Sequence, residues 1–168
     1  MILRLSKAAM VLAMALFASL VSVNNMTDYA SNFAFVQHVF LMDTTFPGNA
    51  LMYRAITSPT LHHLGYIVII ALETVTAALC WIGGVRMLRA LRVSHPLFQR
   101  AKSTAIAGLT LGFLTWQVGF ISVGGEWFAM WMSQEWNGVS AAFRFFMSFI
   151  VVLIYVAMPY DQLQAEAP

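Results

Sequence analysis

Charged residues are scarce in this chain of 168 residues. They make up 10% of it, while 60% of the residues are hydrophobic and the mean hydropathy is +0.75. Soluble globular domains carry about 25% charged residues, so this chain cannot cover a water-soluble surface. The formal net charge of +2 gives no basis for nucleic-acid binding. The composition therefore predicts a protein that has membrane lipids as much of its solvent.

Cysteines and catalytic motifs are also lacking. Cys80 is the single cysteine, which excludes an intramolecular disulfide, a Cys-based redox motif and a Cys-rich metal site. The chain shows no phosphate-binding loop, HExxH motif or hydrolase triad, so enzyme activity has no positive support. The length suits one integral membrane domain over residues 1–168, with no separate soluble domain.

Long apolar segments are abundant, and they predict the fold. A helix needs about 20 residues to cross a hydrocarbon core of about 30 Å. An uncleaved helix is preferred over a secretory signal for the first segment, because Lys7 is the only charge within its apolar run. We therefore expect an all-α, four-helix transmembrane bundle, with spans at about 5–23, 62–85, 103–123 and 139–158.

Two loops on one side of this bundle are rich in aromatic residues. In residues 24–58, Tyr29, Phe33, Val36 and Phe40 recur at helical spacing, which predicts an amphipathic interfacial helix. A Pro-Gly-Asn turn and a short second helix, about 50–56, are expected to follow.

The second aromatic loop, residues 124–138, contains three tryptophans, Trp127, Trp131 and Trp136. Such rings are typical of a membrane–water boundary, because they have one apolar and one wet side. A surface that binds carbohydrate or quinone has the same composition and remains an alternative.

Basic residues predict the orientation. The loop 86–102 contains no acidic residue and five basic ones, which indicates the cytoplasmic side: Arg86, Arg89, Arg92, Arg100 and Lys102. Arg4 and Lys7 fall on the same side if the first two helices are antiparallel. Both termini, including a short polar tail at 160–168, are then expected in the cytoplasm, and the aromatic loops outside.

Three polar residues, Glu73, Gln117 and Arg144, fall at similar depth within the predicted spans. An ionisable group there costs roughly 3 to 10 kcal/mol unless it is paired or hydrated. The axial gap between Glu73 and Arg144 is under about 10 Å, so we expect an ion pair supported by Gln117. The preferred interpretation is a structural lock that fixes helix register. The alternative is a proton or substrate site open to the outer face.

The histidines give weak support for a cofactor. His62 and His63 lie at the outer mouth of the second span, and His38 lies in the preceding loop. Haem b in a bundle needs histidines from two helices, and only His38 with His62 or His63 meets that condition. Histidines at an interface more often bond to backbone or water. We therefore expect no cofactor and no metal, with haem b or quinone as the alternative.

Several segments carry a resemblance to a known family. They are the Pro-Gly-Asn turn at 47–49, TSPTLHHLGY at 57–66, Glu73 and GGEWFAMWMSQEWNG at 124–138. With the four-span plan, the chain resembles a bacterial family of predicted small integral membrane proteins of unknown function. The resemblance implies a bacterial inner membrane and adds no activity. Small multidrug transporters also use a membrane glutamate, but they carry it in the first helix and lack the long outer loop.

Two functional hypotheses follow. The preferred one is a non-catalytic accessory or scaffold subunit that binds a larger membrane complex or lipid through its aromatic outer face. The alternative is a small proton-coupled transporter, or a quinone- or haem-binding electron-transfer subunit. Glu73 and Arg144, or His62 and His63, would then be its working residues. A polar cavity that reaches Glu73 would favour the alternative.

Overall fold

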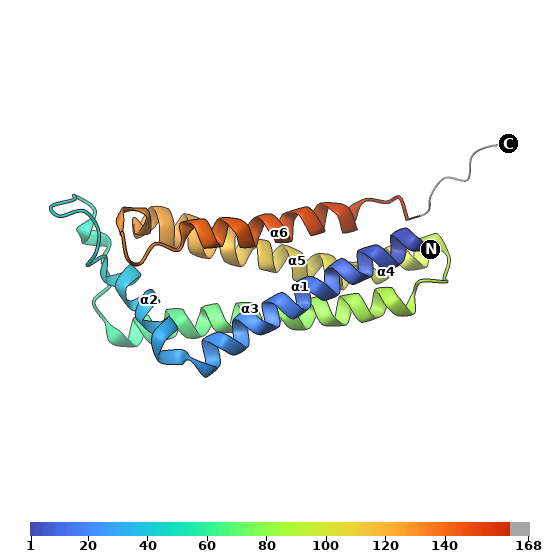
Figure 1. Ribbon diagram of the computed structural model, residues 1–168, viewed down its shortest axis with the longest axis horizontal. Coiled ribbons are helices and arrows are strands. Elements are labelled where there is room, and N and C mark those ends of the chain that lie inside the picture. The colour runs from blue at the N-terminus through green and yellow to red at the C-terminus, as the bar shows by residue number, and fades with distance from the viewer. Residues whose placement is uncertain (162–168) are drawn as a thin grey trace.

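The computed structural model describes residues 1–161 as a helical protein (Figure 1). Residues 162–168 of the expected polar tail lie outside the described part. The helical elements, in chain order, are α1 (Ile2–Thr27), α2 (Tyr29–Leu41), η1 (Met52–Arg54), α3 (Pro59–Arg89), α4 (His95–Ala101), α5 (Ser103–Leu114), η2 (Thr115–Trp127), η3 (Met130–Met132) and α6 (Val139–Ala157).

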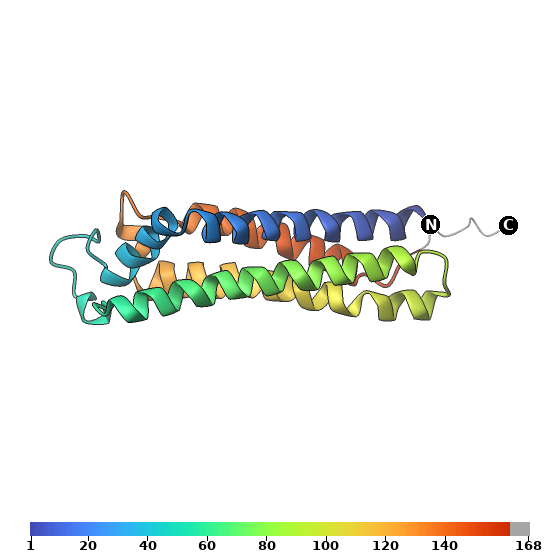
Figure 2. The same cartoon turned by 90° about the horizontal axis from the view of Figure 1, so that it is seen from below.

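Four helices in residues 1–161 are long and apolar enough to cross a membrane. They are α1, α3, the helix His95–Trp127 formed by α4, α5 and η2, and α6. Figures 1 and 2 show them side by side along the long axis of the molecule. This arrangement confirms the all-α, four-helix membrane bundle predicted from the hydropathy.

Local sequence signals explain where the membrane helices begin. Pro59 is the first residue of α3 and directly follows Ser58. The backbone N–H at the first helical position has no partner within the helix, so the absence of this N–H in proline costs nothing there. The third long helix begins at His95, earlier than the 103 expected for its span. Ser94 and Pro96 mark this earlier start, so the turn after α3 is shorter than the predicted loop 86–102.

Small residues bring α3 and α5 close together. A Cβ atom on Gly83 would collide with the backbone of Ala105. A Cβ atom on Gly108 would come within 2.9 Å of the Cys80 backbone nitrogen. Gly108 therefore packs against α3, whereas Gly112 packs against the Phe149 ring of α6, so both glycines lie at helix contacts within this chain.

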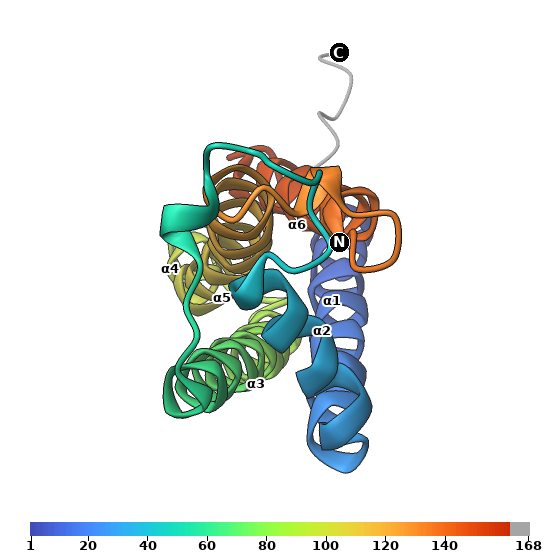
Figure 3. The same cartoon turned by 90° about the vertical axis from the view of Figure 1, so that its left-hand side faces the viewer.

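The end of the bundle formed by α2 and residues 124–138, named the outer end after the predicted orientation, has a separate small core. Val39 and Met42 pack there against Phe128, Ala129 and Met130. Figure 3, which looks onto this end, shows α2 lying between the ends of the long helices.

The opposite, basic end contains a buried ionic cluster. Lys7 Nζ lies 2.7 Å and Lys102 Nζ 3.4 Å from Asp161 Oδ1, and all three residues are about 1% exposed. His95 Nε2 donates a 2.8 Å hydrogen bond to Pro159 O and lies 3.7 Å from Asp161 Oδ2. This cluster ties the end of α6 to α1 and α4. The sequence had suggested only a polar tail here.

Arg4 closes the turn between α3 and α4. Its guanidinium donates hydrogen bonds to Leu91 O at 3.1 Å and Val93 O at 2.6 Å. It also lies over the ring of Phe98, 4.7 Å from the centroid. Arg4 and Lys7 thus lie at the same end as the basic turn, as antiparallel packing of α1 and α3 requires.

Candidate functional site

A cavity of about 320 Å³ lies in the outer half of the bundle, next to α2. Elements α1, α2, α3, η2 and α6 all contribute to its wall. We call it the outer cavity. Its polar lining consists of Asn24, Asn25, Asn32, Tyr66 and Glu73, and its aromatic lining of Phe35, Trp116, Phe120 and Phe145.

Glu73 supplies the carboxyl group of the outer cavity. Its side chain is buried, and the residue is only 1% exposed. Carboxylate oxygen Oε2 accepts a 2.7 Å hydrogen bond from Nδ2 of Asn25. The Tyr66 hydroxyl donates to the backbone oxygen of Asn25 at 2.9 Å, which fixes this part of α1 against α3. Among residues 1–161, no lysine, arginine or histidine forms an ion pair with Glu73.

This arrangement has a chemical consequence. An ionised carboxylate that is buried without a cation is strongly unfavourable, and one amide donor compensates only part of the lost hydration. Glu73 therefore needs either a proton or a cationic ligand to neutralise it. A pocket of about 300 Å³ or more is large enough for a small organic ligand. The outer cavity thus offers space directly beside a carboxylate that lacks a partner charge.

Two rings of the aromatic wall, Trp116 and Phe120, lie on η2. Element η2 continues α5 as a π-helix, and its last bond runs from Phe128 N–H to Val123 O, five residues back. Trp116 and Phe120, four residues apart on η2, both line the cavity. Trp116 is 1% exposed and stacks on Phe149 with ring centroids 5.0 Å apart. The wall is therefore held in place by the core behind it.

A second, smaller cavity of about 170 Å³ adjoins the first. The two share Phe35, Val36, Ile69 and Phe120. The remaining lining of the second cavity is made of apolar side chains and glycines: Val39, Phe40, Gly65, Val68, Leu72, Gly119, Val123, Gly124 and Met130. We call it the apolar chamber. A polar compartment next to an apolar one suits a ligand with a polar head and an apolar body.

The prediction of an ion pair between Glu73 and Arg144 is wrong. The carboxylate of Glu73 bonds to Asn25 instead, and no ion pair within residues 1–161 includes Arg144. Arg144 is exposed, and with Gln117 it lines an open groove between η2 and α6. The cause is helix rotation: Ala142 and Phe149 carry the inward face of α6, whereas Arg144 lies on the face turned away from the core. Similar depth in the membrane did not make these side chains neighbours.

The three outer histidines each contact a different partner. His38 Nδ1 lies 2.8 Å from Asp43 Oδ2, and its ring stacks on Trp136. His63 Nδ1 lies 2.8 Å from the Tyr29 hydroxyl.

His62 is buried, and its Nε2 lies 2.7 Å from the backbone oxygen of Ile56. None of the three histidines lines the outer cavity. The described residues also contain no group of three or more His, Cys, Asp or Glu side chains placed to hold a metal ion.

The tryptophans of residues 124–138 have separate environments. Trp127 and Trp131 are about half exposed, and the Arg54 guanidinium lies 4.6 Å from the centre of a Trp127 ring. Trp136 is held against His38, with ring centroids 4.6 Å apart. Two of the three rings are thus available to lipid or to a partner, as an interfacial position requires.

Sequence reasoning missed the amide partner of Glu73. The apolar run predicts a first span that ends at 23, whereas α1 continues to Thr27 and places Asn24 and Asn25 on the wall of the outer cavity. A pair of amides at the end of an apolar run was the signal available. The side-chain amide of an asparagine needs a hydrogen-bond partner when it lies against other helices, and here the buried carboxylate of Glu73 accepts from Asn25.

The bundle and its buried polar site define a class: a small integral membrane protein with four candidate spans in the described chain. The chain belongs to the family described as "predicted small integral membrane protein (DUF2165)", whose model matches residues 3–159. This match confirms the resemblance seen in the sequence. No curated protein and no solved structure matches the chain.

Proposed function

We propose that the protein binds an amphipathic organic cation in the outer cavity and exchanges it for a proton on Glu73, as a small proton-coupled transporter. One observation carries this proposal. Glu73 is a buried carboxylate on the wall of a cavity of about 320 Å³, and Asn25 is its hydrogen-bond donor. The expected ion-pair form of a structural lock needs a partner charge, and no ion pair within residues 1–161 includes Glu73.

The chemistry of the lining supports a cation as the ligand. Glu73 supplies the only formal charge among the lining residues, and it is negative. Trp116, Phe120 and Phe145 present aromatic rings, and their faces attract organic cations. The apolar chamber supports a ligand that also has a hydrophobic part. An organic cation with apolar substituents satisfies all three features.

Proton exchange follows from the need for a single neutralising charge. A proton and an organic cation would compete for the same carboxylate, so binding of one would release the other. Such competition is the elementary requirement for coupling transport to a proton gradient. In the orientation proposed here, both termini lie in the cytoplasm of a bacterium, the protein spans the inner membrane, and the outer cavity is on the outer side.

The test is binding of tetraphenylphosphonium to the purified protein by equilibrium dialysis in neutral detergent. Triphenylphosphine oxide serves as a neutral comparison. We expect saturable binding of the cation only, and a loss of at least about tenfold in affinity for Glu73→Gln, the equivalent of about 1.4 kcal/mol. Glu135→Gln is the matched control, because Glu135 is exposed and does not line the outer cavity.

A further variant separates ligand binding from stability. Ala141→Phe fills space in the outer cavity while leaving Glu73 in place, so it should abolish binding in a protein that remains monodisperse. Equal affinity in the wild type and in Glu73→Gln would contradict the proposal. So would an Ala141→Phe variant that binds the cation normally. A Glu73→Gln protein that cannot fold, together with normal binding by Ala141→Phe, would restore the structural-lock interpretation.

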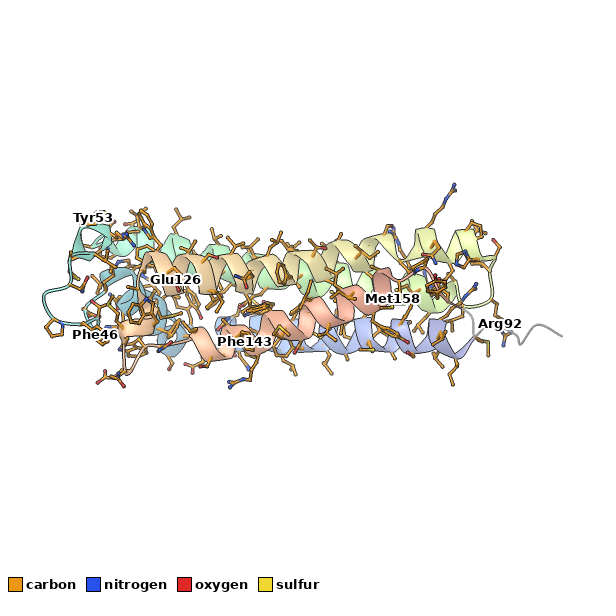
Figure 4. The ribbon with its side chains drawn as sticks, turned by 90° about the horizontal axis from the view of Figure 1, so that it is seen from above. Phe46, Tyr53, Arg92, Glu126, Phe143 and Met158 are labelled. Atoms are coloured by element: carbon orange, nitrogen blue, oxygen red, sulfur yellow. The ribbon has the colours of Figure 1, made fainter. Side chains whose placement is uncertain are left out.

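A second candidate function is an accessory or scaffold subunit of a larger membrane complex. The observation that favours it is the exposed aromatic tip of the outer end. Tyr53 is 75% and Phe46 49% exposed, and both lie at the extreme outer end in Figure 4. Purification from native membranes in gentle detergent, followed by mass spectrometry, tests this candidate. A reproducible large partner supports it, and a Soret band or bound quinone would point to the electron-transfer alternative.

A further inference from the structure

One face of α3 changes from apolar to basic as the helix approaches its end. Trp81, Ile82, Val85, Arg86 and Arg89 line an open groove of about 330 Å³ along this face. Successive members of this set are one or three positions apart in the sequence, and this pattern places all five on one side of a helix. All five side chains are exposed, so this face of α3 is turned away from the bundle.

A second groove, of about 410 Å³, continues from the first. It shares Arg86 and Arg89, and adds Arg100 together with the apolar residues Val93 and Leu97. Three guanidinium groups from α3 and α4 therefore line one groove. Arg86 is fixed against α5, because it donates a 2.6 Å hydrogen bond to the Thr104 hydroxyl.

The positive charge of this groove is uncompensated within residues 1–161. No carboxylate there forms an ion pair with Arg86, Arg89 or Arg100. The nearby buried Asp161 is occupied by Lys7 and Lys102 instead. Three exposed arginines that converge without a protein acid form a site for an anion.

We propose that this groove binds an anionic phospholipid, with its phosphate on Arg86, Arg89 and Arg100. A guanidinium forms paired hydrogen bonds with phosphate oxygens, and basic pockets at the ends of membrane helices suit anionic headgroups. The acyl chains then run along α3 toward Trp81. Eight residues separate Arg89 from Trp81, which is about 12 Å along a helix.

The continuity of the two grooves identifies the source of the phosphate as a lipid. Free phosphate would contact the arginines and leave the apolar groove beside Trp81, Ile82 and Val85 empty. A lipid fills both parts. Trp81 lies at the apolar end of this lining, where the acyl chains would run. This proposal depends on the membrane class of the protein and not on the cation-binding function.

Trp81 gives the proposal a direct test. The delipidated protein, in neutral detergent, is titrated with brominated phosphatidylglycerol or brominated phosphatidylcholine, because bromine quenches a tryptophan that it touches. Subtracting the signal of a Trp81→Phe variant isolates the contribution of Trp81. We expect phosphatidylglycerol to quench Trp81 with an apparent affinity at least about tenfold higher than phosphatidylcholine.

Two charge-matched variants separate a site from general attraction. Arg89→Gln with Arg100→Gln removes two arginines that line the groove. Arg92→Gln with Arg144→Gln removes two exposed arginines outside it, and Figure 4 shows Arg92 at the far tip of the basic end. The first pair should abolish the preference for phosphatidylglycerol, and the second should change it less than about twofold.

Three results would overturn the proposal. They are equal loss in both double variants, equal quenching by the two lipids, and displacement of the brominated lipid by millimolar glycerol 3-phosphate. The first would reduce the effect to diffuse electrostatic attraction, and the last would mean that the groove binds free phosphate. Dynamic light scattering of each variant confirms that aggregation does not cause the change.

Discussion

Replacing Asp161 with asparagine removes the single carboxylate of the buried ionic cluster. Its oxygen Oδ1 lies 2.7 Å from Lys7 Nζ and 3.4 Å from Lys102 Nζ, and the side chains of all three residues are at most 1% exposed. Asp161→Asn keeps the shape of the side chain and leaves two buried ammonium groups without a counter-charge. We expect the variant to unfold more easily than the wild type.

The size of the effect follows from the remaining contacts. Removing one partner of a buried ion pair costs about 3–5 kcal/mol. Lys7 keeps hydrogen bonds to Met158 O at 2.7 Å and Tyr160 O at 3.1 Å, and Lys102 keeps one to Met158 O at 3.0 Å. These carbonyls soften the loss, so we expect the lower limit of about 3 kcal/mol. That is roughly a hundredfold change in the unfolding equilibrium.

Unfolding by increasing mole fractions of dodecyl sulfate in mixed micelles, followed by circular dichroism, measures this difference. Asp43→Asn is the matched control, because Asp43 pairs only with His38 and its side chain is 40% exposed. An exposed pair of this kind is worth about 0–1 kcal/mol. If the two variants unfold within about 0.5 kcal/mol of each other, the buried cluster does not stabilise the fold and the reasoning is refuted.

Three further predictions concern packing and topology. Gly83→Ala should destabilise the protein by about 1–3 kcal/mol, because its Cβ would meet the Ala105 backbone, whereas Gly119→Ala has open space and should be near neutral; equal unfolding midpoints would contradict the close packing of α3 and α5. Cys80 is 0% exposed, so maleimide should label it only after denaturation, and rapid labelling in mild detergent would contradict its burial. A fluorescent protein fused to the C-terminus in bacteria should fluoresce, and alkaline phosphatase fused there should be inactive; the reverse pattern would contradict a cytoplasmic basic end.

Hydropathy alone was sufficient to predict the fold of the bundle. Four long apolar runs and the absence of competing soluble segments leave few arrangements in lipid, where a backbone must satisfy its own hydrogen bonds. These features depend on sequence patterns within one segment, and such patterns are visible without knowledge of the neighbours.

The candidate site was predicted only in part. Glu73 could be selected because a carboxylate within an apolar run is rare and costly. Its partner could not, because the choice between Arg144 and Asn25 depends on how α6 and α1 are rotated about their axes. A side chain's depth follows from counting residues, whereas its direction depends on packing among all helices.

The ionic cluster at the basic end was missed for a related reason. Lys7 and Lys102 counted as markers of topology, and Asp161 belonged to what looked like a polar tail. Only the folded chain brings residues 154 positions apart within 2.7 Å. Charge patterns lead to a prediction of the membrane side, which stays a prediction, and they contain no information about the contact between Lys7 and Asp161.

The most direct test of the central claim is to measure proton release while the cation binds. Purified protein in weakly buffered detergent is titrated with tetraphenylphosphonium, and bound cation and released protons are counted together. If cation and proton compete for Glu73, the wild type should release up to about one proton for each cation bound, and Glu73→Gln should release none. Saturable binding without proton release, or equal release by Glu73→Gln, would contradict the account.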